Sequence, residues 1–320
     1  MSLDMFGLRV CLMLSGYLRQ AIEIYIVTHF KGRLKMVLLD GREVAKKVKL
    51  EVAALAAKFK DRYKRPPQLA VVSVGHDPAS QIYMRNKEKA ALEAGFLFQR
   101  YSLDKENSQE ELDSLITKLN TDSDINGFLV QLPIPQQFSL DSVYAAMNPI
   151  KDSDGFHPEN LGLLMSGRPR VKPCTPYGIM KILEHYNIPV SGKNAVVIGR
   201  SNIVGKPMAQ LLLAADATVT MCHTKTQDLK HFTQDADIII VAAGKAEFLD
   251  GSYFNSKAVV IDVGMHHING KMTGDVNFKS AAEKVAAISP VPGGVGQMTV
   301  AMLLKNTVDL AFEQEARRII

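Results

Sequence analysis

The sequence predicts an α/β protein made of two three-layer α/β units, with the C-terminal helix returning to the first unit. Apolar runs that end near glycine, the pattern of buried parallel strands, alternate with amphipathic segments of helical length. This alternation occurs twice, on either side of a boundary between Asp154 and Pro176. The chain has 320 residues, 47% of them hydrophobic, which is enough to bury the cores of two domains.

The first succession of elements starts after Met36. We expect helices over 42–63 and 108–119, strands over 69–75, 97–103 and 127–132, and a helix opened by Asp77 as N-cap with Pro78 in its first turn. Right-handed crossovers between parallel strands would make this a βαβαβ unit. The unit carries most of the candidate reactive groups.

The second succession starts after Pro173. We expect helices over 175–186, 205–215 and 297–316, and strands over 194–199, 217–223, 236–244 and 258–264. The expected domains are residues 36–155 plus 298–320, and residues 176–297. Residues 1–35 are expected to be a dispensable extension, an alternative upstream start or partly an expression artefact.

Composition excludes several classes of protein. The net charge is +5, but residues 1–35 contribute +3 of it, so the body is too weakly basic for a nucleic-acid-binding surface. No apolar run reaches the roughly 20 residues that span a bilayer. The three scattered cysteines form neither a disulfide framework nor a zinc-binding spacing, so we expect no metal site and a reducing, cytoplasmic location.

The second unit is expected to be a Rossmann-like dinucleotide-binding domain. Its first strand ends at Gly199, and a loop leads to a helix that begins near Gly205, which places backbone N–H groups where a phosphate can bind. The next strand ends in His223-Thr224-Lys225 instead of the acid that often binds the ribose of NAD. With Arg200 close by, this favours NADP over NAD, although a solvated basic loop is the alternative.

The candidate reactive groups lie mainly in the first unit. Tyr83 and Lys87 are four residues apart on one helix face, where a desolvated amine could exchange protons near neutral pH. Gln131 follows a buried strand, the position at which α/β sheets bind ligands. An ordinary helix face for the first pair, and turn-forming roles for Gln131 and for Asp154, are the alternatives.

From Met36 onward the chain resembles the bifunctional methylenetetrahydrofolate dehydrogenase/methenyltetrahydrofolate cyclohydrolase family. The resemblance rests on eight motifs in order: YMRNK, VQLPIP, KDSDGF, KPCTPYG, GRSNIVGKP, CHTKT, GDV and PVPGGVGQMT. It implies that NADP accepts a hydride from 5,10-methylenetetrahydrofolate and that water then opens the methenyl product to 10-formyltetrahydrofolate. It also implies a homodimer.

The resemblance assigns roles to individual residues. Lys87 would transfer the proton in the hydrolysis, Gln131 would hydrogen-bond its amine, Tyr83 would stack on the folate, and Asp154 would bind the pterin amino edge. The folate cleft would be lined by Val130, Leu132, Pro292, Gly293, Gly294, Val295 and Gly296. NADP would be held by Gly199, Arg200, Ser201 and Thr224, with Met265 near the cofactor.

Three departures from the family pattern keep every reactive group: Thr224 replaces Ser, Ser153 replaces Val, and Met265 replaces Ile. Three other functions remain open at this point. A shikimate-dehydrogenase-like oxidoreductase is disfavoured by VQLPIP and PVPGGVGQMT. A member with the dehydrogenase alone, or a non-catalytic NADP-binding scaffold, is disfavoured because Lys87, Gln131 and Asp154 are all present.

Overall fold

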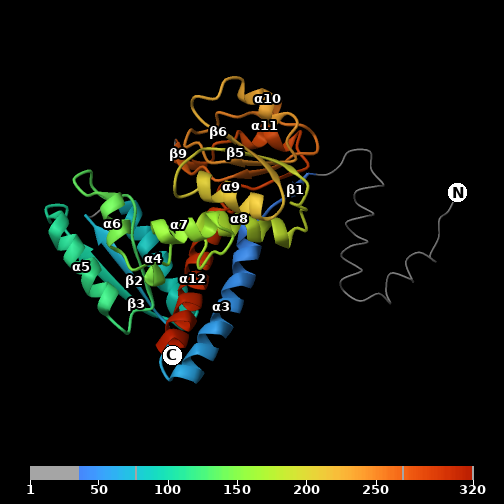
Figure 1. Cartoon of the computed structure of the whole chain (residues 1–320). Helices are drawn as coiled ribbons and strands as arrows, with labels where there is room; N and C mark the ends of the chain where they lie inside the picture. The colour runs from blue at the N-terminus through green and yellow to red at the C-terminus, as the bar shows by residue number, and fades with distance from the viewer. Residues whose placement is uncertain (1–35, 76–77, 269, 319–320) are drawn as a thin grey trace, which may run out of the picture.

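The computed structural model describes residues 36–75, 78–268 and 270–318, and shows two α/β units connected by long helices (Figure 1). The predicted N-cap Asp77 and the extension 1–35 lie outside the described residues. Within them, no helix is long and apolar enough to cross a membrane.

The smaller unit is built on a three-stranded parallel sheet with the order β3-β2-β4. Its elements are α3 (Gly41–Tyr63), β2 (Gln68–Val74), α4 (Pro78–Glu93), β3 (Leu97–Leu103), α5 (Gln109–Thr121), β4 (Gly127–Val130), α6 (Leu140–Ala146), the 3-10 helix η1 (Pro149–Lys151) and α7 (Pro158–Met165). β2 and β4 are almost entirely buried, as their apolar runs predict, because helices cover both faces of the sheet. α6 and α7 are not anticipated by the sequence analysis.

The larger unit is built on a six-stranded parallel sheet with the order β1-β11-β8-β7-β5-β6. Its elements are β1 (Val37–Leu38), α8 (Cys174–His185), β5 (Asn194–Ile198), α9 (Gly205–Ala214), β6 (Thr218–Cys222), α10 (Leu229–Thr233), β7 (Ile238–Val241), the 3-10 helix η2 (Gly251–Tyr253), β8 (Val259–Asp262), an antiparallel hairpin of β9 (His266–Ile268) and β10 (Lys271–Thr273), α11 (Phe278–Ala282) and β11 (Ala287–Ile288). The sheet order reverses at β5, whose neighbours are β6 and β7. Such a switch point is the usual ligand-binding position of a Rossmann-like unit.

The C-terminal helix α12 (Gly296–Arg318) returns to the smaller unit, as predicted. It follows the last strand of the larger sheet and packs along α3, α4 and β4, and also against α8. Figure 1 shows α12 in red beside α3 in blue. Its residues Ala301 to Leu304 are completely buried, so this helix is part of the core of the smaller unit.

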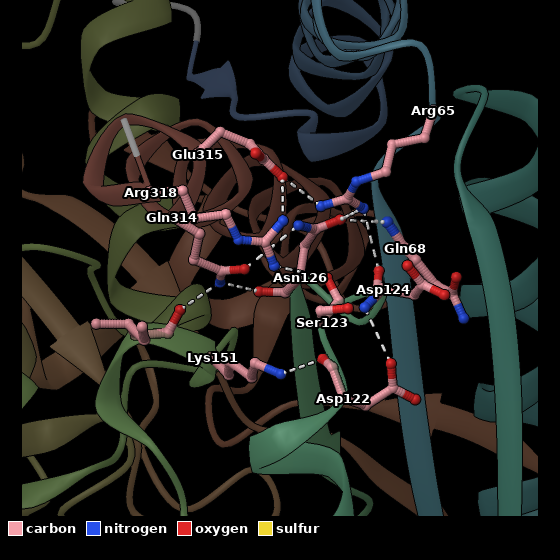
Figure 2. A network of polar contacts seen from close by, with 11 residues as sticks. Arg65, Gln68, Asp122, Ser123, Asp124, Asn126, Lys151, Gln314, Glu315 and Arg318 are labelled. Atoms are coloured by element: carbon pink, nitrogen blue, oxygen red, sulfur yellow. Dashed lines mark hydrogen bonds and ion pairs between the residues drawn. The ribbon is translucent and has the colours of Figure 1, made fainter. Parts of the chain in front are cut away.

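A polar network fixes the far end of α12 to the smaller unit (Figure 2). Arg65 donates to Glu315 at 2.6 Å, and Gln314 donates to the backbone oxygen of Asn126 at 2.6 Å. Lys151 points its amine at the carbonyls of Leu119 (2.8 Å) and Asp122 (2.5 Å) near the end of α5. The contacts of Glu315 and Gln314 fix how α12 lies against the sheet, and Lys151 fixes the neighbouring η1 to the end of α5.

Candidate active site

Lys87 and Gln131 face each other across the smaller unit. Lys87 lies on α4, and its Nζ donates to Oε1 of Gln131, just beyond β4. The Gln131 amide is oriented because its Nε2 donates to the Leu132 carbonyl at 2.7 Å, which leaves Oε1 for the amine. Burial lowers the pKa of Lys87, partly offset by the charge of Asp154. The amine is therefore neutral at a lower pH than an exposed lysine.

Asp154 is presented by a tightly built loop after η1. The neighbouring Asp152 is completely buried and accepts hydrogen bonds from Gly155 N (2.9 Å), His157 N (2.8 Å) and Asn160 Nδ2 (2.9 Å). The Asp152 carboxylate therefore holds the loop together by hydrogen bonds. Burial raises the pKa of Asp154 to about 6, against the opposing charge of Lys87.

The helix α12 holds this loop from behind. Asn306 Nδ2 donates to the carbonyls of Ser153 (2.9 Å) and Lys172 (2.8 Å), and Thr307 Oγ1 donates to Ser153 Oγ (2.9 Å). A Cβ on Gly127 would run into the Ser153 hydroxyl, so a serine fits here only against a glycine. The serine that departs from the family pattern is therefore fully buried and hydrogen-bonded.

Two further side chains surround Asp154 and were not anticipated as site residues. Cys174 is completely buried, and burial together with the charge of Asp154 raises the pKa of its thiol well above the usual value. It is a neutral neighbour of the carboxylate and not a nucleophile. The Tyr144 hydroxyl is buried without a hydrogen-bond partner among the described residues. Burial raises the pKa of the Tyr144 hydroxyl, and the negative charge of Asp154 raises it further.

A contact between Tyr83 and Met265 joins the two units. Tyr83 lies one turn before Lys87 on α4, and its hydroxyl donates to Met265 Sδ at 3.1 Å. Met265 belongs to the loop between β8 and β9 of the larger unit. Both side chains are accessible, 39% for Tyr83 and 48% for Met265, so a ring and a thioether remain open to a ligand at this contact.

The segment 292–296 passes beside the start of α3. Gly293 has φ of +108° and accepts a hydrogen bond from Gly41 N at 2.9 Å. A Cβ on Gly41 would run into the Gly294 carbonyl, so the two backbones touch. Val295 is buried in the core, as is Val130 on β4, so either can offer a ligand only backbone atoms.

The residues predicted to bind the nucleotide lie together at the carboxyl edge of the larger sheet. β5 and β6 are parallel neighbours, so Gly199 after β5 and Thr224 after β6 share this edge. Gly199 has φ of +129°, and a Cβ there would run into the Ala242 carbonyl. The Ser201 hydroxyl accepts from Val204 N at 3.1 Å, which orders the loop that opens α9.

The charge at this edge suits a phosphorylated ribose. Arg200, Thr224 and Lys225 are exposed, and no side chain of the described residues forms an ion pair with Arg200 or Lys225. The glycine backbone leaves room for a pyrophosphate near the start of α9. The residues present therefore fit NADP.

A second carboxylate network lies at the carboxyl edge of the larger sheet and was not predicted. Asp275 is completely buried and accepts from the backbone N–H groups of Ala243 (2.7 Å), Gly244 (2.9 Å) and Lys245 (3.0 Å), and pairs with His266 Nε2 at 2.7 Å. It ties the loop after β7 to the residue that follows Met265. Asp275 lies in the GDV motif, which the sequence analysis singled out without predicting these contacts.

The comparisons with known proteins agree across almost the whole described chain. Residues 39–154 match the family described as tetrahydrofolate dehydrogenase/cyclohydrolase, catalytic domain, and residues 173–315 match its NAD(P)-binding domain. The bifunctional protein FolD of Bdellovibrio bacteriovorus is 51% identical over 284 residues, which cover 88% of this chain and 98% of that protein.

Two solved structures are also similar. The FolD methylenetetrahydrofolate dehydrogenase/cyclohydrolase of Campylobacter jejuni has a TM-score of 0.84 and 45% identity, covering 87% of this chain and 99% of that one. The Trypanosoma brucei enzyme, solved with NADP and an inhibitor, has a TM-score of 0.84 and 36% identity, covering 88% and 98%. With both domain families matched over more than half of its length, the chain belongs to the tetrahydrofolate dehydrogenase/cyclohydrolase family.

Proposed function

We propose that this protein oxidises 5,10-methylenetetrahydrofolate with NADP and then hydrolyses the methenyl product to 10-formyltetrahydrofolate. One observation supports the second step above all others. The Lys87 amine is desolvated, held by Gln131 and close enough to Asp154 for their charges to influence each other. A dehydrogenase alone needs positioning more than a tuned base, whereas a hydrolase needs a proton acceptor.

The folate is proposed to bind with its pterin toward Asp154 and its ring system against Tyr83. The Asp154 carboxylate would accept hydrogen bonds from the pterin amino edge, because Asp152 is already occupied by its own loop. Tyr83 offers an accessible ring face from α4. Backbone groups of Leu132 and of Pro292 to Gly296 would complete the cleft.

Lys87 is proposed to manage the proton of the hydrolysis. Water adds to the methenyl carbon, and one of its protons goes to the neutral Lys87 amine. As the bond from this carbon to N5 breaks, N5 gains the remaining hydroxyl proton, and Lys87 returns its proton to solvent. Gln131 would keep the amine in one position through the Oε1 contact.

The cofactor is proposed to lie along Gly199, Arg200, Ser201 and Thr224, with Met265 near its reactive end. When bound, NADP supplies the hydride acceptor. Arg200, with Lys225 beside it, would pair with the 2′-phosphate, and this distinguishes NADP from NAD. Met265 and Tyr83 would contact the two ligands where the nicotinamide and the folate meet.

Several broader properties are also part of the proposal. Residues 36–155 with 298–320 would form the folate domain and residues 176–297 the NADP domain, although β1 pairs with the larger sheet. The protein would act as a homodimer in the cytoplasm, where Cys174 and Cys222, both unpaired, stay reduced. A protein starting at Met36 would keep both activities; a large loss in a soluble, folded protein would contradict this.

The test follows reduced cofactor and methenyl product separately, with NADP and then NAD, in wild type, Lys87→Met and Lys89→Met. Lys89 is the matched control because it lies on the same helix and its side chain is 77% exposed. Lys87→Met should lower the methenyl-to-formyl rate by about 10²- to 10⁴-fold. NADP binding without turnover of this folate by wild type would refute the proposed function.

A further inference from the structure

One buried carboxylate holds the loop that follows β7. Asp275, just after β10, is completely buried. Its Oδ2 accepts from the N–H groups of Ala243 at 2.7 Å and Gly244 at 2.9 Å. Its Oδ1 accepts from Lys245 N at 3.0 Å and lies 2.7 Å from Nε2 of His266, the first residue of β9. Asp275 therefore joins the backbone of this loop to a side chain of the β9–β10 hairpin.

The His266 ring is the donor in its contact with Asp275. Because both Asp275 oxygens accept backbone N–H groups, the carboxylate acts as an acceptor, and Nε2 carries the proton between them. The His266 side chain is 23% exposed, and among the ion pairs of the described residues it is the one partner of Asp275. Without it, the carboxylate would keep three backbone donors, all from the loop after β7. The fold would survive, but this link to the hairpin would be lost.

A second buried carboxylate, Asp262 at the end of β8, extends the network. Its Oδ1 accepts from Gly264 N at 2.9 Å and from Asp275 N at 3.0 Å. Its own N–H donates at 2.8 Å to the hydroxyl of Ser289, which follows β11. A Cβ on Gly264 would run into Asp275, so the two segments are in close contact. The ends of three adjacent strands, β7, β8 and β11, are therefore joined into one edge.

This edge lies between the predicted phosphate-binding loop and the smaller unit. A Cβ on Gly199 would run into the Ala242 carbonyl, so the end of β5 touches the start of the loop after β7. At the other end, the Tyr83 hydroxyl donates to Met265 Sδ at 3.1 Å. Ligands of such sheets lie outside the carboxyl ends of the strands, where the strand order reverses. A dinucleotide that starts at Gly199 and reaches the smaller unit at Met265 therefore passes the loop 243–245.

We propose that His266, through Asp275, is a positioning residue for the nicotinamide end of NADP, so that its loss impairs the oxidation and spares the hydrolysis. The inference rests on the proposed function. The ring does not need to touch the cofactor, because it holds Met265 and the loop 243–245 in one arrangement. Transfer of a hydride depends steeply on such an arrangement, since a displacement of about 1 Å can cost about 10²-fold in rate. The hydrolysis is assigned to Lys87 in the other unit and does not use this edge.

The experiment measures the two reactions separately in wild type, His266→Ala, His266→Asn and the control His267→Ala. His267 is the next residue of the same strand and is exposed. Oxidation is followed with 5,10-methylenetetrahydrofolate and NADP, and hydrolysis with 5,10-methenyltetrahydrofolate and no cofactor. His266→Ala should lower kcat of the oxidation about ten- to a hundredfold and leave the hydrolysis within about twofold of wild type. His266→Asn keeps an N–H donor and should recover most of the oxidation rate.

The fluorescence of bound NADPH tests the same idea without turnover. The emission of the reduced nicotinamide should differ from wild type in His266→Ala and not in His267→Ala. The Kd for NADPH should change less than about tenfold, because the phosphate end of the cofactor keeps Arg200. His266→Leu, which retains bulk and lacks the donor, takes the place of His266→Ala if urea unfolding shows that the alanine variant is unstable.

An oxidation rate in His266→Ala equal to that of wild type, or an equal loss of both activities, would overturn the inference. So would a failure of His266→Asn to recover more of the rate than His266→Ala. If wild type does not turn over the folate, an altered NADPH emission confined to the His266 variants supports the positioning role and refutes only the proposed function. Turnover by wild type with unchanged emission and unchanged rate in His266→Ala refutes only the positioning role.

Discussion

Replacing Asn306 by Ala should both destabilise the protein and loosen the loop that carries Asp154. The Asn306 amide is 2% exposed and donates to two carbonyls, Ser153 O at 2.9 Å and Lys172 O at 2.8 Å. These oxygens belong to the loop that carries Asp154 and to the segment before α8. The substitution removes their donor, and the alanine methyl group cannot donate a hydrogen bond in its place.

The magnitude follows from the two oxygens that lose the amide donor, of which the Ser153 carbonyl keeps only a weak thiol donor, Cys174 Sγ at 3.5 Å. A buried acceptor that loses its hydrogen bond costs about 1–3 kcal/mol, so the two together cost about 2–6 kcal/mol. This is a large part of the roughly 5–15 kcal/mol that stabilises a typical domain. The control is Asp309→Ala on the same helix, which breaks a half-exposed pair with Lys305 and should cost less than about 1 kcal/mol.

Urea unfolding measures both variants, provided that the slope of the free energy with denaturant stays unchanged. We expect Asn306→Ala also to raise the KM for folate, because Asp154 is displaced, while the KM for NADP stays as in wild type. A loss of stability no larger than in Asp309→Ala would show that the two hydrogen bonds do not hold the loop, and the reasoning would fail.

Three further predictions concern charge. Because the pKa of Asp154 is raised to about 6, the KM for folate should rise as pH falls through 6. Asp154→Asn should bind folate weakly at every pH. A wild-type KM that is independent of pH from 5 to 8 would contradict this prediction. Arg200→Ala should raise the KM for NADP about ten- to a hundredfold and leave that for NAD unchanged, measured in the same assay. Burial lowers the pKa of Lys151 to about 8, below its unfolded value, so the folded state binds fewer protons and stability should increase as pH rises from about 8 to about 10.5. Lys151→Met should remove that increase in urea titrations between pH 7 and 10.5.

Most regular elements were predictable because their periodicity is strong. The strand 97–103 and the helices that become α3 and α12 have the predicted bounds to within about two residues, since apolar spacing alone defines them. The sequence analysis missed α6, α7, α10, α11, the two-residue strands β1 and β11, and the hairpin of β9 and β10. They are short and partly exposed, and their positions depend on tertiary contacts that no local pattern encodes.

Of the candidate site, only the residues that lie in sequence motifs could be predicted. Lys87, Gln131 and Asp154 could be named from the sequence, and the contact between Lys87 and Gln131 is present. The partners that hold them could not be named. Asn306 is 153 residues from Ser153, and Cys174 reaches Asp154 only through the path of the chain between the units. Long-range hydrogen bonds of this kind have no signature in sequence spacing.

The position of α12 in the chain has a consequence for how the protein is made. Residues 36–155 leave the ribosome long before residues 296–318, which pack along α3 and hold the loop of Asp154. Until then, the face of α3 that α12 will cover remains open, and Val52, Ala56 and Phe59 are among its buried residues. During synthesis, the larger unit can therefore complete its sheet before α12 adds its residues to the core of the smaller unit. A nascent chain from which the larger unit has emerged and α12 has not would present this open face of α3 to chaperones and proteases.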